Sequence, residues 1–198
     1  MKDETKAKWL STANNLAYRM SNTKRSKANK VFCWVLVVFL IIWFAGMVSI
    51  KVFGVRYNFT NSMKTGFYTM DHKEAYQLGD TVEVCLPNKF ANLGFKRSYL
   101  MSGSCPDGIQ PLVKEIIGVP GDVIDVTHKG MTVNGTFYDA PQHSKDSKGR
   151  PLETFEAHNL KIKGYLVYGK NDYQLSWDSR YYGVLPSSSI VSVMSYAQ

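Results

Sequence analysis

Two residues of this 198-residue chain are candidates for acyl-transfer chemistry, Ser62 and Lys114. Ser62 lies in the stretch NFTNSMKTGFY (residues 58–68), among small hydroxyl and amide residues. A serine becomes a nucleophile when a neighbouring group accepts its proton and when donors stabilise the oxyanion. Taken alone, Ser62 is weak evidence, because most serines beside turns only hydrogen-bond to nearby backbone.

A histidine base for Ser62 is disfavoured by the sequence. All four histidines lie in polar, loop-like segments, and they are scattered along the chain: His72, His128, His143 and His158. None of them is closely spaced with a cysteine, as a metal site would require. The sequence therefore predicts neither a Ser-His-Asp triad nor a metal or cofactor site.

Lys114 is the more unusual candidate because of its neighbours in PLVKEIIGVPGD (111–122). In the alternation of a strand, Leu112, Lys114 and Ile116 share one face, and Glu115 points to the other. Burial disfavours an ammonium and lowers its pKa, which is what a lysine general base requires. The alternative is a lysine on an edge strand whose ammonium reaches water. The segment itself leaves both interpretations open.

The element that precedes both candidates is an uncharged run of twenty residues, VFCWVLVVFLIIWFAGMVSI (31–50). At about 1.5 Å per residue, a helix of this length spans roughly 30 Å, the thickness of a bilayer's hydrocarbon core. A core helix is rarely apolar on every face over this length. A cleaved signal peptide usually has a shorter apolar region followed by a small-x-small site. The run therefore predicts an uncleaved transmembrane helix over residues 31–50.

Basic residues are concentrated before the apolar run. Residues 1–30 carry eight Lys or Arg against two acidic residues, a net of +6 out of the chain's +8. The positive-inside rule keeps this leader in the cytoplasm and exports residues 51–198. The exported part has a net charge of only +2, so the basic balance gives little support to nucleic-acid binding. Within the leader, residues 6–20 favour a short amphipathic helix and residues 21–30 a polar tether.

Beyond the apolar run, short β-like segments alternate with turn residues such as LGD, VPGD and VNG. The segments expected to form strands are 66–70, 80–86, 112–119, 122–128, 130–138, 165–169 and 189–195. The polar stretch 140–159 is expected to be an exposed loop. The pattern predicts one mostly-β exported domain on one N-terminal transmembrane helix.

The exported part holds two cysteines, Cys85 and Cys105, whereas Cys33 lies in the apolar run. In an oxidising compartment such a pair usually forms a disulfide. Two free buried thiols are the alternative.

Four sequence blocks, in this order, resemble the type I signal peptidase family (S26) of Ser-Lys proteases. They most closely resemble its conjugative-transfer branch, the TraF-type pilin peptidases. The blocks are TNSM with Gly66 and Tyr68, LGDTVEV (78–84), VKEIIGVPGDVI (113–124) with MTVNG (131–135), and SWDSRYYG (176–183). The resemblance implies a signal-peptidase-like β-domain that covers most of residues 58–193.

Carried over position by position, the resemblance implies roles for four site residues. Ser62 is the implied nucleophile and a neutral Lys114 the implied base. The Ser62 N–H and the Thr60 hydroxyl would form the oxyanion hole, and the Ser176 hydroxyl would orient the lysine.

Asp178 and Arg180 match a structural pair that holds the terminal block near the site. The alternative for these two is a surface ion pair of little energetic value. The Cys85 and Cys105 pair resembles the conjugative branch. Lys64 departs from the family pattern, which usually has proline there, and its role stays open.

The implied function is that of a membrane-bound serine endopeptidase that processes a conjugative pilin precursor through an acyl-enzyme. Head-to-tail cyclisation of the pilin is one implied outcome. The implied partners are a membrane-embedded prepilin or preprotein, the lipid bilayer and other proteins of the transfer apparatus. The implied location is the bacterial inner membrane, with residues 51–198 in the periplasm. The alternatives are a general type I signal peptidase and a catalytically silent scaffold of the transfer apparatus.

Overall fold

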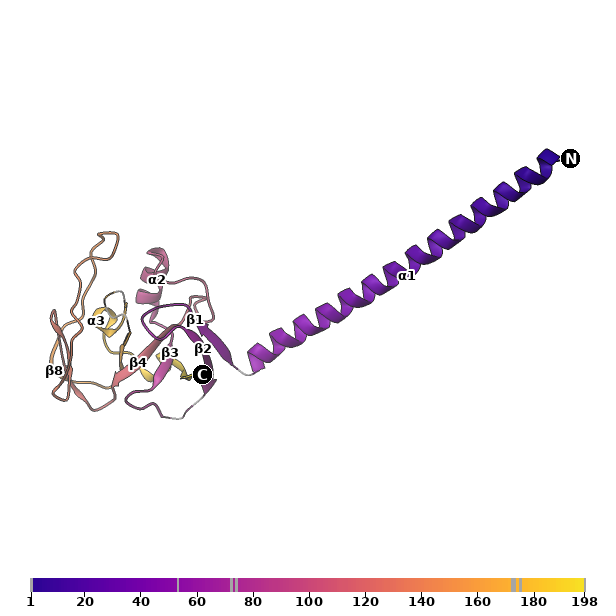
Figure 1. Ribbon diagram of the computed structural model, residues 1–198. Coiled ribbons are helices and arrows are strands. Elements are labelled where there is room, and N and C mark those ends of the chain that lie inside the picture. The colour runs from indigo at the N-terminus through magenta and orange to yellow at the C-terminus, as the bar shows by residue number, and fades with distance from the viewer. Residues whose placement is uncertain are drawn as a thin grey trace. The chain divides into compact units, whose positions relative to one another are not determined.

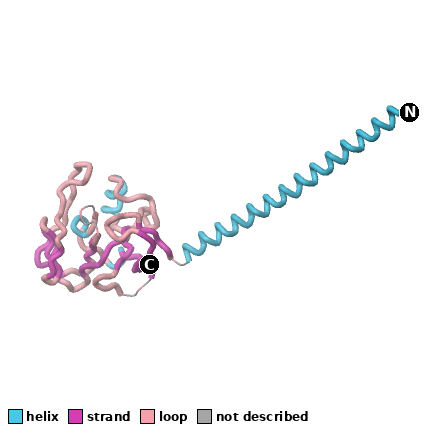
Figure 2. Tube along the Cα trace, in the orientation of Figure 1, coloured by secondary structure: helices cyan, strands magenta, loops and turns pink. Residues whose placement is uncertain are grey.

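The computed structural model describes residues 2–52, 54–71, 73, 75–171, 174 and 176–197. The chain divides into two compact units, Met1–Val52 and Phe53–Gln198 (Figure 1). Among the described residues, those of the first unit form a helix, and the strands all belong to the second (Figure 2).

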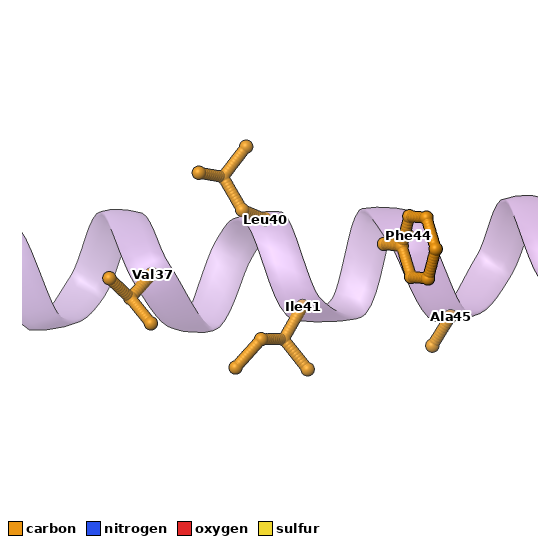
Figure 3. Close-up of a pocket in the computed structure, with 5 residues that line it drawn as sticks. All are labelled: Val37, Leu40, Ile41, Phe44 and Ala45. Carbon is orange, nitrogen blue, oxygen red and sulfur yellow. The ribbon is translucent and has the colours of Figure 1, made fainter.

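The first unit is one continuous helix, α1 (Lys2–Val52). The polar tether expected over residues 21–30 is helical instead, because this segment contains no glycine or proline to interrupt a helix. Within α1, the 22 residues Lys27–Val48 are long and apolar enough to cross a membrane, with a mean hydropathy of 2.8. Figure 3 shows apolar side chains that project from this stretch in different directions, namely Val37, Leu40, Ile41, Phe44 and Ala45.

The second unit contains two antiparallel sheets, which confirms the prediction of a mostly-β domain. The larger sheet has the strand order β1-β2-β10-β3-β4-β9, and the smaller one β7-β6-β5-β8. The larger sheet consists of β1 (Val55–Asn58), β2 (Gly66–Asp71), β3 (Thr81–Val84), β4 (Leu112–Gly118), β9 (Leu166–Tyr168) and β10 (Ile190–Tyr196). The smaller sheet consists of β5 (Val123–Thr127), β6 (Gly130–Val133), β7 (Thr136–Tyr138) and β8 (Ala157–Lys161).

Three short helices complete this unit, α2 (Asn88–Lys96), α3 (Ser179–Tyr182) and a 3-10 turn at Ser187–Ser189. The elements predicted from the sequence did not include α2, β1 or β8. The predicted segment 130–138 is a hairpin of β6 and β7, because Asn134 and Gly135 both take positive φ in the turn between them. The polar stretch 140–159, expected to be a loop, ends in the first residues of β8.

Strand β4 contributes to both hydrophobic cores of this unit. Ile116 packs into the core that includes Val82 and Val167, and Ile117 packs into the core that includes Ile124 and Leu166. Successive side chains of a strand point to opposite faces, so one strand can serve both cores. Because β4 is also paired with β3 on one side and β9 on the other, it is a rigid platform for any side chain it carries.

Cys85 and Cys105 form a disulfide, as predicted, with their Cα atoms 5.7 Å apart. The bond closes a loop of 20 residues that contains α2. A closed loop of this size stabilises a fold by about 3 kcal/mol in the chain-entropy account. A disulfide is consistent with a domain outside the cytoplasm, where oxidising conditions preserve such bonds.

Candidate active site

Lys114 is the buried charged residue at the centre of the site. Lys114 is only 2% exposed, and it lies on the core face of β4, where it is paired with Val82 of β3. Its Nζ donates to Ser62 Oγ at 2.9 Å and to Ser176 Oγ at 3.1 Å. The alternative of an edge-strand lysine that reaches water is wrong, because β4 has a partner strand on each side. Ser62 and Ser176, which are 52 and 62 positions from Lys114 in the sequence, thus both contact its amine.

Burial lowers the pKa of Lys114 from 10.5 to about 8. The negative charge of Asp178 opposes this shift, and the positive charge of Arg180 adds to it. A pKa near 8 leaves a useful fraction of the amine neutral at physiological pH, whereas an ordinary lysine is almost fully protonated there. A neutral amine has a lone pair that can accept the Ser62 hydroxyl proton while its N–H groups still donate to Ser176.

The β1–β2 loop, residues 59–65, carries Ser62 and is organised by the buried side chain of Asn58. Asn58 Nδ2 donates to the carbonyl oxygens of Thr60 (2.9 Å), Met63 (3.2 Å) and Lys64 (3.1 Å). Its Oδ1 accepts from the Thr60 backbone N–H at 3.1 Å and from the Thr60 hydroxyl at 2.8 Å. One buried amide therefore fixes the backbone on both sides of Ser62.

The Thr60 hydroxyl lies beside Ser62 but is directed towards Asn58. Its Oγ1 is 3.4 Å from Ser62 Oγ. Because three carbonyl oxygens face Asn58 Nδ2, the atom that faces Thr60 is Oδ1, which can only accept. The Thr60 proton is thus donated to Asn58 in this structure. To donate to a substrate oxyanion, the hydroxyl has to turn this proton away from Asn58.

Gly169 allows the terminal block to approach the nucleophile. A Cβ at Gly169 would clash with Ser176 Oγ and would lie 3.1 Å from Ser62 Cβ. The following residues continue the contact, since the Asn171 N–H donates to the Ser62 carbonyl at 3.1 Å. A side chain at position 169 would therefore separate Ser176 from Ser62.

Asp178 and Arg180 form a fully buried ion pair, so the alternative of a surface pair is wrong. Both side chains are 0% exposed, and Arg180 Nε lies 2.8 Å from Asp178 Oδ1. Arg180 Nη2 donates to Asp178 Oδ2 and to the Ser176 carbonyl, each at 2.9 Å. Asp178 Oδ2 also accepts the Gly169 N–H at 3.2 Å. The pair thus connects the two segments that surround Lys114.

Trp177 anchors the terminal block to α2. A Cβ at Gly94 would lie only 2.6 Å from the indole ring of Trp177, so the helix approaches the ring closely. The ring also packs against Tyr99 and Tyr182, with centroids 5.4 Å and 5.8 Å away. The block that carries Ser176 is therefore held by packing on one side and by the buried ion pair on the other.

Residues 28–197 match the family described as signal peptidase, peptidase S26. The chain belongs to this family. The match covers the apolar part of α1 and nearly all of the β-domain. It confirms the resemblance drawn from the sequence blocks.

Two relatives of this signal peptidase family member are named for conjugal transfer. A probable conjugal transfer protein TraF of Sinorhizobium fredii is 32% identical, over 77% of this chain and 84% of that protein. A conjugal transfer protein TraF of Agrobacterium fabrum is also 32% identical, over 71% and 80%. A crystal structure of a signal peptidase I from Enterococcus faecalis is 20% identical, with a TM-score of 0.36, and covers 62% of this chain and 98% of that chain.

The site residues predicted from the sequence of this signal peptidase family member did not include Asn58, Gly169 or Trp177. Asn58 had a usable signal, because an Asn two residues before a Thr is a common start of an Asx turn. Gly169 and Trp177 had none, since their roles depend on contacts between segments distant in the sequence. Within the described part of the chain, no three His, Cys, Asp or Glu side chains gather where they could hold a metal ion.

A Lys114 base predicts a specific dependence of activity on pH. Only the neutral amine accepts a proton, so kcat/KM for a peptide substrate should rise with pH and level off above the Lys114 pKa of about 8. The profile is measured from about pH 6 to about pH 10, with the unfolding midpoint recorded at each pH. A rise centred near pH 10, or a flat profile, would contradict a buried lysine base.

Proposed function

We propose that this protein is a membrane-anchored serine endopeptidase that cleaves a conjugative pilin precursor through an acyl-enzyme. The observation that carries the proposal is the 2.9 Å contact between Lys114 Nζ and Ser62 Oγ. Family membership supports peptidase chemistry at this contact, and the relatives named for conjugal transfer support the type of substrate.

In the proposed reaction, the neutral Lys114 amine accepts the Ser62 proton as Ser62 Oγ attacks the scissile carbonyl carbon. The C–N bond then breaks, the Lys114 ammonium returns the proton to the leaving amine, and the acyl group remains on Ser62 as an ester. Water or another amine next attacks the ester, again with Lys114 as the proton acceptor. The bond between the acyl carbon and Ser62 Oγ then breaks, and the Lys114 ammonium returns the proton to Ser62 Oγ. Ser176 keeps the Lys114 amine oriented through its 3.1 Å hydrogen bond.

The proposed oxyanion hole consists of the Ser62 backbone N–H and the Thr60 hydroxyl. In this role Thr60 exchanges its hydrogen bond to Asn58 for one to the oxyanion as the charge develops. A donor aimed at a developing oxyanion stabilises the transition state by about 3 to 4 kcal/mol. Asp178 and Arg180 have an indirect role, which is to hold the backbone of Gly169 and Ser176.

The proposed orientation places the N-terminus in the cytoplasm and the β-domain in the periplasm of a bacterial inner membrane. The net charge of +6 in residues 1–30 favours it, and the Cys85–Cys105 disulfide agrees with it. In the sequence, Ser62 follows Val52, the last residue of α1, by ten positions. This short connection suits a substrate whose cleavage point emerges from the same bilayer, and the proposed partners are such a prepilin and the lipids around it.

The experiment that tests the proposal follows a pilin precursor of the same transfer system in cells that produce the full-length protein. We expect the precursor to be shortened when the protein is present and to stay intact with the Ser62→Ala variant. Mass spectrometry of the product distinguishes hydrolysis from transfer to the pilin's own amine, because a cyclic product is one water lighter than the linear one. An intact precursor alongside cleavage of a general exported preprotein would favour a general signal peptidase. Cleavage of neither substrate by the folded protein would favour a silent scaffold.

A further inference from the structure

We propose that Tyr196, near the C-terminus, is a positioning residue that fixes the β1–β2 loop through Lys64. The inference rests on the proposed role of Ser62 as the nucleophile, because Lys64 lies two residues after Ser62. It also assigns a role to Lys64, which stands where the family pattern usually has proline.

The last strand of the domain brings Tyr196 to the end of this loop. In β10, Tyr196 is paired with Tyr68 of β2, and the two rings meet edge to face with centroids 5.3 Å apart. The next residue continues the pairing, since the Ala197 N–H donates to the Phe67 carbonyl at 2.9 Å. The sheet thus fixes the backbone of Tyr196, and the Tyr68 ring packs against its side chain.

Lys64 lies over the Tyr196 ring. Its Nζ is 3.9 Å from the ring centroid, a distance at which the cation is attracted by the face of the ring. The Tyr196 hydroxyl also donates to the carbonyl of Thr65, at a longer distance of 3.4 Å. The side chain of Lys64 and the backbone beside it therefore contact the same aromatic residue.

Gly66 gives independent evidence for this close approach. A Cβ at position 66 would lie 2.9 Å from two atoms of Tyr196, and the φ of Gly66 is 138°. The backbone can take this conformation and leave room for the ring only because residue 66 is a glycine. The loop and the ring are therefore built to fit against each other.

The backbone of Lys64 is held from a second direction. The Lys64 carbonyl accepts from Asn58 Nδ2 at 3.1 Å and from the Tyr68 hydroxyl at 2.8 Å. With its side chain on Tyr196 and its carbonyl on Asn58 and Tyr68, Lys64 has little freedom to move. Proline restricts a loop by fixing φ, whereas here the contact between Lys64 and Tyr196 restricts the loop through tertiary structure.

The test uses single and double variants of the full-length protein with a peptide that spans the cleavage site. An exposed cation–π contact changes an equilibrium by about two- to fivefold. We therefore expect Lys64→Met and Tyr196→Leu each to lower kcat by about this factor while KM stays nearly constant. Lys64→Arg keeps the cation and Tyr196→Phe keeps the ring, so each of these variants should retain most of the kcat of the unchanged protein. The double variant Lys64→Met/Tyr196→Leu should be no slower than the slower single variant, because both remove one contact.

Three outcomes would overturn the inference. One is an unchanged kcat in both single variants, and another is a double variant in which the two losses multiply. The third is a rise in KM alone for Lys64→Met, which would indicate that Lys64 contacts the substrate directly. Lys129→Met, in the exposed β5–β6 turn, is the matched control for loss of a positive charge. Ser62→Ala distinguishes the two proposals: activity in that variant would contradict the proposed function, whereas unaffected Lys64 and Tyr196 variants would contradict this inference alone.

Discussion

Replacing Lys114 with methionine is expected to slow cleavage of the precursor by about a thousandfold or more. The variant loses the amine that lies 2.9 Å from Ser62 Oγ, and no other side chain is hydrogen-bonded to that oxygen as a base among the described residues. Methionine has a similar length and suits the apolar face of β4. Since a buried ammonium is costly, the unfolding free energy should not fall. The measurement combines single-turnover cleavage with denaturant unfolding of the same preparation.

The control for this prediction is Lys129→Met, which removes a lysine from the exposed turn between β5 and β6. We expect the control to cleave at the rate of the unchanged protein. A Lys114→Met protein that is folded and retains a tenth or so of the activity would exclude Lys114 as the base. Ser62→Ala should match the Lys114→Met loss, and the double variant should be no slower, because both residues serve one step.

Replacing Arg180 with methionine is expected to lower the unfolding free energy by about 3 to 5 kcal/mol. The reason is that the Asp178 carboxylate would stay buried without its cation, since both side chains are 0% exposed. The Ser176 carbonyl would also lose the donor that now lies 2.9 Å away. Cleavage should therefore fall together with stability. Denaturant unfolding of the full-length protein in detergent measures the first effect, and single-turnover cleavage measures the second.

A second variant shows whether the loss comes from the unpaired charge. The double variant Asp178→Asn/Arg180→Met removes both charges and should be more stable than Arg180→Met alone. Lys89→Met is the matched control, because it breaks an ion pair with Glu153 in which both side chains are exposed. We expect no measurable change in that control. Equal stability of Arg180→Met and the control would show that the buried pair does not hold the domain together.

The elements that could be predicted from the sequence are those whose pattern is set locally. The apolar run at residues 31–50 and the turn residues around β5, β6 and β7 mark their elements directly. In contrast, β8 shows no alternation, because every residue after Ala157 in it is exposed. Helix α2 begins after Pro87 without a capping side chain, so the usual signal of a helix start is missing. Strand β1 is only four residues long and begins five positions after the end of the apolar run.

The same distinction between local patterns and distant contacts applies to the residues of the candidate site. The strand pattern offered the burial of Lys114 as one of two interpretations, because Leu112 and Ile116 share its face. The pairing of β4 on both sides, which the sequence did not show, decides between them. The burial of Asp178 and Arg180 could not be predicted, since charged residues in a short polar-looking block are more often exposed. The contact of Lys64 with Tyr196 could not be predicted from the sequence either. The two residues are 132 positions apart, and the pairing of β10 with β2 brings them together.

The low pKa of Lys114 also links folding to pH. In the folded chain this amine loses its proton near pH 8, whereas in the unfolded chain it keeps the proton up to about 10.5. Between these values the unfolded state binds more protons than the folded state, so the Lys114 contribution to stability increases as the pH rises. Many enzymes gain activity at the expense of stability. Here the cost of burying the ammonium is relieved above about pH 8, which is the range in which Lys114 is already in the neutral form that acts as the base.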